Sequence, residues 1–346
     1  MRAVAQALRR AATRPASGAL RFTSGVSPPA ENFMAIEKKV AEVQSALREM
    51  YHEARYADAL ELATSFSSEV EEHFGEDHPV SASFLNNRAL MHRSMGQYAS
   101  AMPLYERALR AYEKVVGKEH PSTTTCLSNM SYLCKTLAAS GEMRGVEKLA
   151  MLERAREYGE QALQNKRALS MPEHPDVAIA QYNLGAVLVE MKSFDRAELN
   201  LREALALLRK RFGAQDNRLT ATALNNVGVC LKRKAEHVAS SDPDAPPLLA
   251  ELDAARAAYD EALQMRSRLL GEVHPDTLAA RHNIAELCET LATTGGVELF
   301  FNRAAADFAA EANDIRLEIL KSLEAEEDVA SLLAAEEERE GAGGGR

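Results

Sequence analysis

The chain has 346 residues, 46% hydrophobic and 27% charged, so it can form one large domain or two ordinary ones and is too apolar to be mostly disordered. Aromatic residues make up only 5% and Trp is absent, which favours an all-α fold over a sandwich, a barrel or an α/β nucleotide fold. The net charge of −10 argues against nucleic acid or anionic lipid as a partner, because both require a basic surface. No apolar run reaches the roughly 20 residues of a membrane span.

Residues 1–30 differ in composition from the rest of the chain. They contain five arginines and no Asp or Glu, with Ser and Thr scattered among alanines. This composition is typical of an organelle transit peptide, and Val4, Leu8 and Ala11 would share one face of a basic amphipathic helix. We predict a disordered mitochondrial presequence, with a plastid address or a basic tail on a cytosolic protein as alternatives. Its removal would leave 36 bases against 51 acids, a net charge of −15.

A repeated unit organises the remainder of the chain. The dipeptide His-Pro occurs four times, each time with an Asn nine residues after the His, and a fifth copy starts at Asn217. Two alanines seven residues apart follow each Asn, and this spacing places both on one face of a helix. Three of these units, and a more degenerate copy before His78, end on an apolar residue followed by Gly, which can cap a helix, while Pro suits the first turn of the next. The units start at His78, His120, His174, Asn217 and His274, and their alanine pairs are Ala101 and Ala108, Ala155 and Ala162, Ala197 and Ala204, Ala255 and Ala262, and Ala305 and Ala312.

Each unit is predicted to form helix, turn and helix. One helix pair cannot bury its apolar face alone, so consecutive pairs must stack into a solenoid, which we place at residues 31–325. A more degenerate copy precedes His78, and an acidic and then Gly-rich tail follows at 326–346. The predicted repeats are 35–77, 78–119, 120–173, 174–216, 217–273 and 274–320.

Three units carry extra residues between their helices. We expect 138–153 and 297–308 to be helical and to lengthen their hairpins, and 236–249, with its three prolines, to form a loop. All three inserts lie at the same kind of turn, so they should project from one edge of the solenoid. Leu299, Phe300 and Phe301 are expected to pack in the core of the last repeat, with a second protein contact as the alternative.

The segments HPVSASFLNNRALMHRSMGQYASAMPLYERALRAYEKVVGKEHP and HPDVAIAQYNLGAVLVEMKSFDRAELNLREALALLRKRFG closely resemble the long tetratricopeptide repeats of the kinesin light chain type. The resemblance covers roughly residues 35 to 320. It implies an all-α, right-handed superhelical solenoid of about six helix pairs, whose concave groove is lined by the first helices and receives a peptide or a partner helix. Unlike kinesin light chain, this sequence has no heptad coiled coil before the repeats.

The recurring Asn marks the candidate binding surface. If it faces the groove, the residues one before, three after and six after it lie near the same surface. Its amide can donate and accept, so the five asparagines could bind the backbone of an extended ligand or, alternatively, the adjacent helix. Three repeats place a base six residues after the Asn, where it could hold an acidic segment or simply be solvated. The candidate residues are Asn87, Asn129, Asn183, Asn226 and Asn283, with Arg93, Lys135 and Lys232.

No pattern in the sequence indicates catalysis. The histidines of the repeats lie one repeat apart and cannot converge on one metal ion, and the chain has no phosphate-binding loop. The four cysteines form no CxxC pair, which is typical of a reducing compartment, and should pack as small hydrophobic residues in the first helices. We therefore predict no enzyme, no metal and no cofactor. The cysteines are Cys126, Cys134, Cys230 and Cys288.

These features predict a non-enzymatic scaffold or assembly factor. It would act in the mitochondrial matrix or on the matrix side of the inner membrane, as a member of a larger complex. Its partner would be a protein or peptide, with an acidic segment as one form, and not a nucleic acid. The alternative is a cytosolic cargo adaptor similar to kinesin light chain.

Overall fold

The structure is a computed structural model that describes the backbone of residues 30–171, 173–242 and 244–343, with side chains from residue 35 to 324. Almost all of the predicted presequence lies outside the described residues. The described residues form thirteen α helices and no strand. The helices are α2 (Ala30–His52), α3 (Tyr56–Phe74), α4 (Pro79–Ser94), α5 (Tyr98–Val115), α6 (Pro121–Ala139), α7 (Gly145–Leu169), α8 (Pro175–Glu190), α9 (Phe194–Phe212), α10 (Arg218–Ser241), α11 (Leu249–Leu270), α12 (Pro275–Thr293), α13 (Val297–Phe301) and α14 (Ala305–Gly343).

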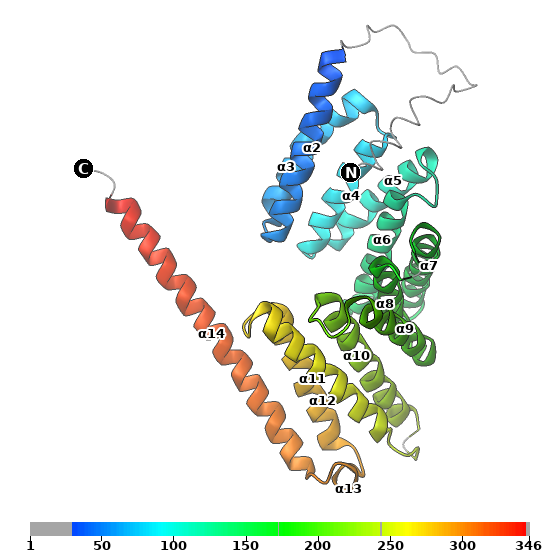
Figure 1. Cartoon of the computed structure of the whole chain (residues 1–346), viewed down its shortest axis with the longest axis vertical. Coiled ribbons are helices and arrows are strands. Elements are labelled where there is room, and N and C mark those ends of the chain that lie inside the picture. Colours follow the sequence, from blue (N-terminus) through cyan, green and yellow to red (C-terminus); the bar gives the residue numbers. More distant parts are fainter. Residues whose placement is uncertain (1–29, 172, 243, 344–346) are drawn as a thin grey trace. The chain divides into compact units, whose positions relative to one another are not determined.

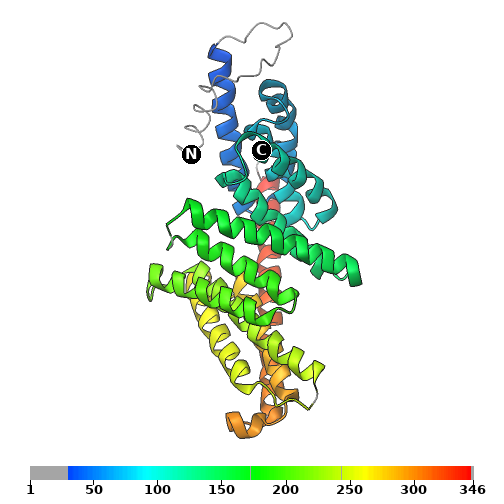
Figure 2. The ribbon, with the colours of Figure 1, turned by 90° about the vertical axis from the view of Figure 1, so that its right-hand side faces the viewer.

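The chain divides into two compact units, residues 1–49 and 50–346. The division falls inside the predicted first repeat, within α2. In the second unit the helices pack as sequential antiparallel pairs, and the second helix of each pair contacts the first helix of the next (Figures 1 and 2). The fold is therefore an all-α solenoid of stacked pairs. The pairs are α4 with α5, α6 with α7, α8 with α9, α10 with α11, and α12 with α14.

The first helices of these pairs also contact one another in succession, from α4 through α6, α8 and α10 to α12. They therefore share one surface. The predicted alanine pairs explain how closely the helices approach, because all of these alanines are buried except Ala305, which is partly exposed. Small side chains at these positions let helix backbones come near each other and bury the neighbouring leucines and tyrosines.

The four His-Pro units owe their recurrence to helix capping. In each, the His is the N-cap and its Nδ1 accepts a hydrogen bond from the backbone N–H two residues later, as for His78 and Val80 at 3.3 Å. Asn217 makes the same cap with its Oδ1, which accepts from the N–H of Leu219 at 2.9 Å. Imidazole and amide are interchangeable here because both offer one acceptor at the distance that an N-cap requires.

Two of these caps predict acid sensitivity. Burial lowers the pKa of His78 and His120, and a protonated imidazole cannot accept the capping hydrogen bond. The stabilisation is therefore fully present above the ordinary His pKa of about 6.5 and is lost as pH falls through the lower pKa of the folded state. The double variant H78N/H120N should lose less stability than the wild type between pH 7.5 and 5.0 in urea unfolding, by about 1 kcal/mol per cap. An unchanged pH dependence in this variant would contradict the prediction.

The linkers between repeats are also tied down locally. Gly75, Gly117, Gly213 and Gly271 end second helices with φ between 62° and 93°, a region that favours glycine. The carbonyl of Gly117 then accepts from Thr123 Oγ1 at 2.7 Å, and Gly75 and Gly271 accept from equivalent hydroxyls. At Gly213 the linker to the cap is one residue longer, and Thr220 Oγ1 has no hydrogen-bond partner among the described residues.

The inserts differ in part from the sequence prediction. The loop expected at 236–249 is wrong at its start, because α10 continues to Ser241 and no Pro precedes that point to stop it. The helical inserts are interrupted, since 140–144 separates α6 from α7 and 302–304 separates α13 from α14. Helix α14 continues to Gly343, well beyond the predicted repeat end at 320. At the position where Gly213 and Gly271 end α9 and α11, α14 has Lys321, so no glycine stops the helix.

Candidate functional site

All eight predicted site residues lie on the first helices, on α4, α6, α8, α10 and α12. Their side chains are partly buried rather than fully exposed. The structure therefore brings them onto the surface that the first helices share. It does not bring them together at one point, because successive repeats separate them.

Two of the five predicted asparagines already form hydrogen bonds within the protein. The Nδ2 of Asn129 donates to Asn86 Oδ1 at 3.2 Å, and the Nδ2 of Asn283 donates to Asn225 Oδ1 at 2.8 Å. Each bond joins one first helix to the next, so these amides hold neighbouring repeats in register. Asn86 and Asn225 are not among the predicted site residues, although both occupy the position one before a predicted Asn.

The remaining predicted asparagines make no such contact. The side chains of Asn87, Asn183 and Asn226 are half-buried and have no hydrogen bond to other side chains in the part of the chain that the structure describes. Of the five predicted asparagines, these three have amides that could bind the backbone of a ligand.

Lys232 is already matched by acids. Its Nζ lies 2.8 Å from a carboxylate oxygen of Glu286 and 3.5 Å from one of Glu236, and only 11% of its side chain is exposed. Arg233 likewise bonds Glu190 at 2.5 Å, and Glu236 accepts from Thr290 Oγ1 at 2.9 Å. The shared surface over α8, α10 and α12 is therefore balanced in charge, and a clamp for an acidic segment finds no excess of base there.

The other two predicted bases form a different arrangement, which we call the cationic cluster: Arg93, Tyr132 and Lys135. The Cζ of Arg93 lies 4.7 Å from the centre of the Tyr132 ring, and the Nζ of Lys135 lies 4.9 Å from it. The Tyr132 side chain is 45% exposed, so a ring flanked by two cations faces outward. Neither cation has an ion pair with an acid among the described residues.

The electrostatics of the cluster favour an incoming negative charge. Burial lowers the pKa of Lys135, Glu190 acts in the opposite direction, and Arg233 lowers it further. A carboxylate beside Lys135 would stabilise its charged form. Arg93 is oriented by a long hydrogen bond of 3.5 Å to Asn129 Oδ1. Tyr132 lies three residues after Asn129, one of the positions expected on this surface. It is not among the predicted site residues because the predicted bases all lie six residues after an Asn.

The four cysteines lie within first helices and are buried. Burial raises the pKa of the Cys126 thiol to about 12 and of the other three to about 11, so none is a thiolate at neutral pH. The described residues contain no group of three or more His, Cys, Asp or Glu placed to hold a metal ion. None of the described helices has a stretch both long and apolar enough to span a bilayer.

Family models for the tetratricopeptide repeat match residues 81–122, 147–210 and 249–276. Two curated relatives are both named clustered mitochondria protein homolog. The human protein is 29% identical over 145 residues, and that of Meyerozyma guilliermondii is 23% identical over 218 residues. These matches cover 40% and 63% of this chain but only 10% and 16% of the relatives, so the chain spans a small part of their length.

Solved structures with a similar fold include one whose title names a putative kinesin light chain and one of a protein named BtubC. One, from Podospora anserina, has nearly identical TPR-like repeats, a TM-score of 0.48 and 15% identity, and covers 71% of this chain and 95% of that one. The other is BtubC of P. vanneervenii, with a TM-score of 0.48 and 19% identity, covering 82% of this chain and 92% of that one.

Proposed function

The chain is a tetratricopeptide repeat protein, a scaffold of the kind that binds other proteins, and from this premise we propose that it acts in mitochondria as a non-enzymatic assembly or accessory factor. It would hold an acidic segment of a partner protein on the surface shared by its first helices. The observation that carries the binding proposal is the cationic cluster, where two bases without an acidic partner among the described residues flank an exposed ring.

The charges of Arg93 and Lys135 are not matched by an acid among the described residues. On α10, Lys232 and Arg233 each contact an acid of a neighbouring repeat, so a ligand carboxylate would have to displace an existing pair there. At the cationic cluster a ligand carboxylate gains two charge-assisted contacts and displaces none. An apolar or aromatic group next to that carboxylate could pack on the exposed part of Tyr132.

The mitochondrial part rests on two different supports. Residues 1–30 have five arginines and no acid, as presequences do. Both curated relatives are named clustered mitochondria protein homolog, which supports a connection with the organelle. We place the protein in the matrix or on the matrix side of the inner membrane.

One experiment tests the compartment. The full chain is expressed with a C-terminal tag in its native cells, and mass spectrometry identifies both its first residue and the proteins that co-purify with it. We expect a new N-terminus between about residue 20 and 35 and a complex of mitochondrial proteins. An intact Met1 together with motor or cytoskeletal proteins would overturn the proposal in favour of the cytosolic cargo adaptor.

A second experiment tests the binding surface. The variant R93S/K135S should co-purify with at least tenfold less partner than the wild type, because both contacts to the partner's carboxylate are removed. The matched control R110S/R211S removes the same charge from exposed positions on α5 and α9 and should recover the partner normally. Equal losses in both variants would show that net charge, not the cluster, governs binding.

A further inference from the structure

A second surface lies at the turns that join the first helix to the second helix in the last two repeats. The start of α11, directly after the turn from α10, lies beside α13. A Cβ on Gly296 would stand 3.6 Å from Leu249 Cδ1, and Val297 and Phe301 belong to the same apolar cluster as Leu249. The two turns are therefore joined by packing and form one edge of the second unit (Figure 1).

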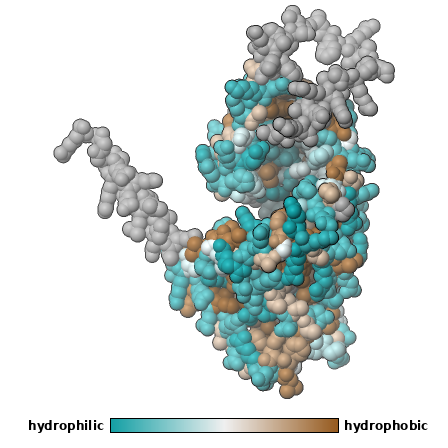
Figure 3. All heavy atoms as spheres, in the orientation of Figure 1, coloured by the Kyte–Doolittle hydropathy of each residue, from teal (hydrophilic) through white to brown (hydrophobic). Residues whose placement is uncertain are grey.

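This edge exposes apolar side chains. Leu299 is 94% exposed and Phe300 is 50% exposed, and Pro246 and Pro247 in the adjacent turn are exposed as well. Figure 3 shows hydrophobic atoms gathered at this lower end of the view. We call these four residues the insert-edge surface. The sequence prediction that 299–301 would pack in the core is correct for Phe301 and wrong for the other two.

The exposure follows from how α13 is held. Val297 is 1% exposed, and the Phe301 ring contacts the Phe308 ring with centroids 5.6 Å apart, so two of its five residues point inward. Gly296 and Asn302 flank the helix with φ of 77° and 49°, which fixes its direction at both ends. With the inward face used, Leu299 and Phe300 must point out. Nothing in the described part of the chain covers Leu299.

The unpaired charge around the insert-edge surface is acidic, because Arg256 and Arg303, which directly follow residues 237–255 and 294–302, both pair with Glu311. These two segments together contain five acids and no Lys or Arg. None of these five has an ion pair among the described residues, in contrast to the paired acids of the first helices. An anionic lipid surface would be repelled here, whereas a basic polypeptide would be attracted. The acids are Asp242, Asp244, Glu251, Asp253 and Glu298.

We propose that the insert-edge surface binds a basic amphipathic helix of a partner protein. The apolar stripe of that helix would cover Leu299 and Phe300, and Lys or Arg residues on its flanks would face the five carboxylates. This contact is independent of the cationic cluster, which selects the opposite charge. The chain would thereby hold two partner segments of opposite charge at separate places, as a scaffold requires.

The test uses the full chain and two synthetic 18-residue helical peptides with the same Leu and Phe stripe, one flanked by Lys and the other by Glu. Fluorescence anisotropy should show the Lys peptide binding at least tenfold tighter than the Glu peptide, with the difference reduced in high salt. The variant L299S/F300S should weaken the Lys peptide at least tenfold. Both residues are exposed, so the variant should keep the thermal unfolding of the wild type.

The matched control is V146S/L149S, which removes two apolar side chains that are 82% and 61% exposed at the α6–α7 insert. It should bind the Lys peptide as the wild type does, and so should R93S/K135S, which separates this proposal from the proposed function. Equal binding of both peptides, or no effect of L299S/F300S, would overturn the inference. A third outcome would also overturn it: the wild type binds vesicles of phosphatidylcholine and phosphatidylglycerol, and L299S/F300S loses this binding while its peptide binding is unchanged. The surface would then be a lipid contact.

Discussion

Replacing Gly228 by alanine should destabilise the protein by about 1–3 kcal/mol, although the change adds a single methyl group and improves helix propensity. A Cβ at this position of α10 would stand 2.6 Å from the ring of Tyr259 on α11. That ring is 1% exposed and closely packed, so it cannot turn aside without disturbing its neighbours. Urea unfolding of G228A measures the loss directly.

Gly295 provides the control for this prediction. A Cβ there would meet nothing within 4 Å, and its φ lies outside the left-handed region. G295A should therefore change the free energy of unfolding by no more than about 0.5 kcal/mol. If G228A were as stable as G295A, the Tyr259 ring would have room to move, and the tight contact between α10 and α11 would not limit the packing of this repeat.

The same contact between the two helices of a pair recurs in other repeats, but the glycine can lie on either helix. In three repeats, the position two residues after the recurring Asn meets the position four residues after the first alanine of the second helix. Gly185 faces Leu201, Gly228 faces Tyr259, and in the α6–α7 pair Ser131 faces Gly159, where a Cβ would stand 3.1 Å from Ser131 Oγ. A glycine on one helix thus accompanies a larger side chain on the other, from Ser131 to Tyr259 in size. The variant G228S/Y259G should accordingly be more stable than the sum of its single changes predicts.

The regular part of this fold was predictable because it is local. The His-Pro starts, the alanine pairs and the glycine stops each act within one helix or one turn, so their spacing along the chain is enough to place the helices. The use of Asn217 in place of a capping His is also a local feature, because a cap involves only residues two apart in sequence. Even the positions facing the shared surface could be inferred from helical periodicity.

The charge pattern of the site could not be predicted in this way. Whether a base is free depends on an acid one repeat away, and the inserts vary the length of that separation. Lys232 forms an ion pair with Glu286, 54 residues later, whereas Lys135 forms no ion pair with an acid among the described residues. The three predicted bases looked alike in the sequence, and only the packing of neighbouring repeats distinguishes the matched Lys232 from the unmatched Arg93 and Lys135.

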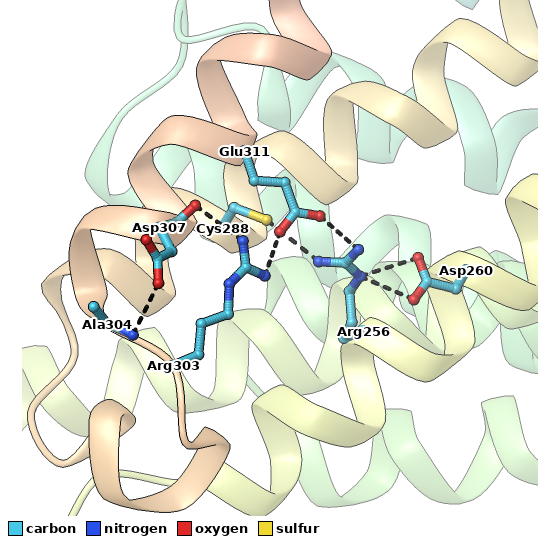
Figure 4. A network of polar contacts seen from close by, with 7 residues as sticks. All are labelled: Arg256, Asp260, Cys288, Arg303, Ala304, Asp307 and Glu311. Carbon is cyan, nitrogen blue, oxygen red and sulfur yellow. Dashed lines mark hydrogen bonds and ion pairs between the residues drawn. The ribbon is translucent and has the colours of Figure 1, made fainter.

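The end of the solenoid depends on a different kind of contact. Helix α14 packs on α12 through Phe308 and Ala312, and a polar network joins its first turns to α11 (Figure 4). Glu311 accepts from Arg256 at 2.7 Å and from Arg303 at 2.6 Å. Burial opposes the ionisation of Glu311, but these two hydrogen bonds outweigh it and hold the pKa of its carboxyl below the ordinary value.

Removing this carboxylate should loosen α14 from the last repeat. In E311A, Arg256 keeps Asp260 as a partner while Arg303 loses its ion pair, and we expect a loss of about 1–3 kcal/mol because the side chains of Arg256 and Glu311 are only about a quarter exposed. Amide hydrogen exchange should quicken over residues 305–316 more than in α4 to α9, since the network is local to α11, α12 and α14. E311Q should be intermediate, because it retains a hydrogen-bond acceptor without the charge.

A matched control lies one helical turn further along α14. Glu289 of α12 pairs with Arg316, and both side chains are at least 40% exposed, so E289A should cost no more than about 0.5–1 kcal/mol. Comparable losses in E311A and E289A would mean that the network of Figure 4 adds nothing beyond a surface ion pair. In that case the packing of Phe308 and Ala312 alone would hold α14, and with it the direction of α13 and its exposed Leu299 and Phe300.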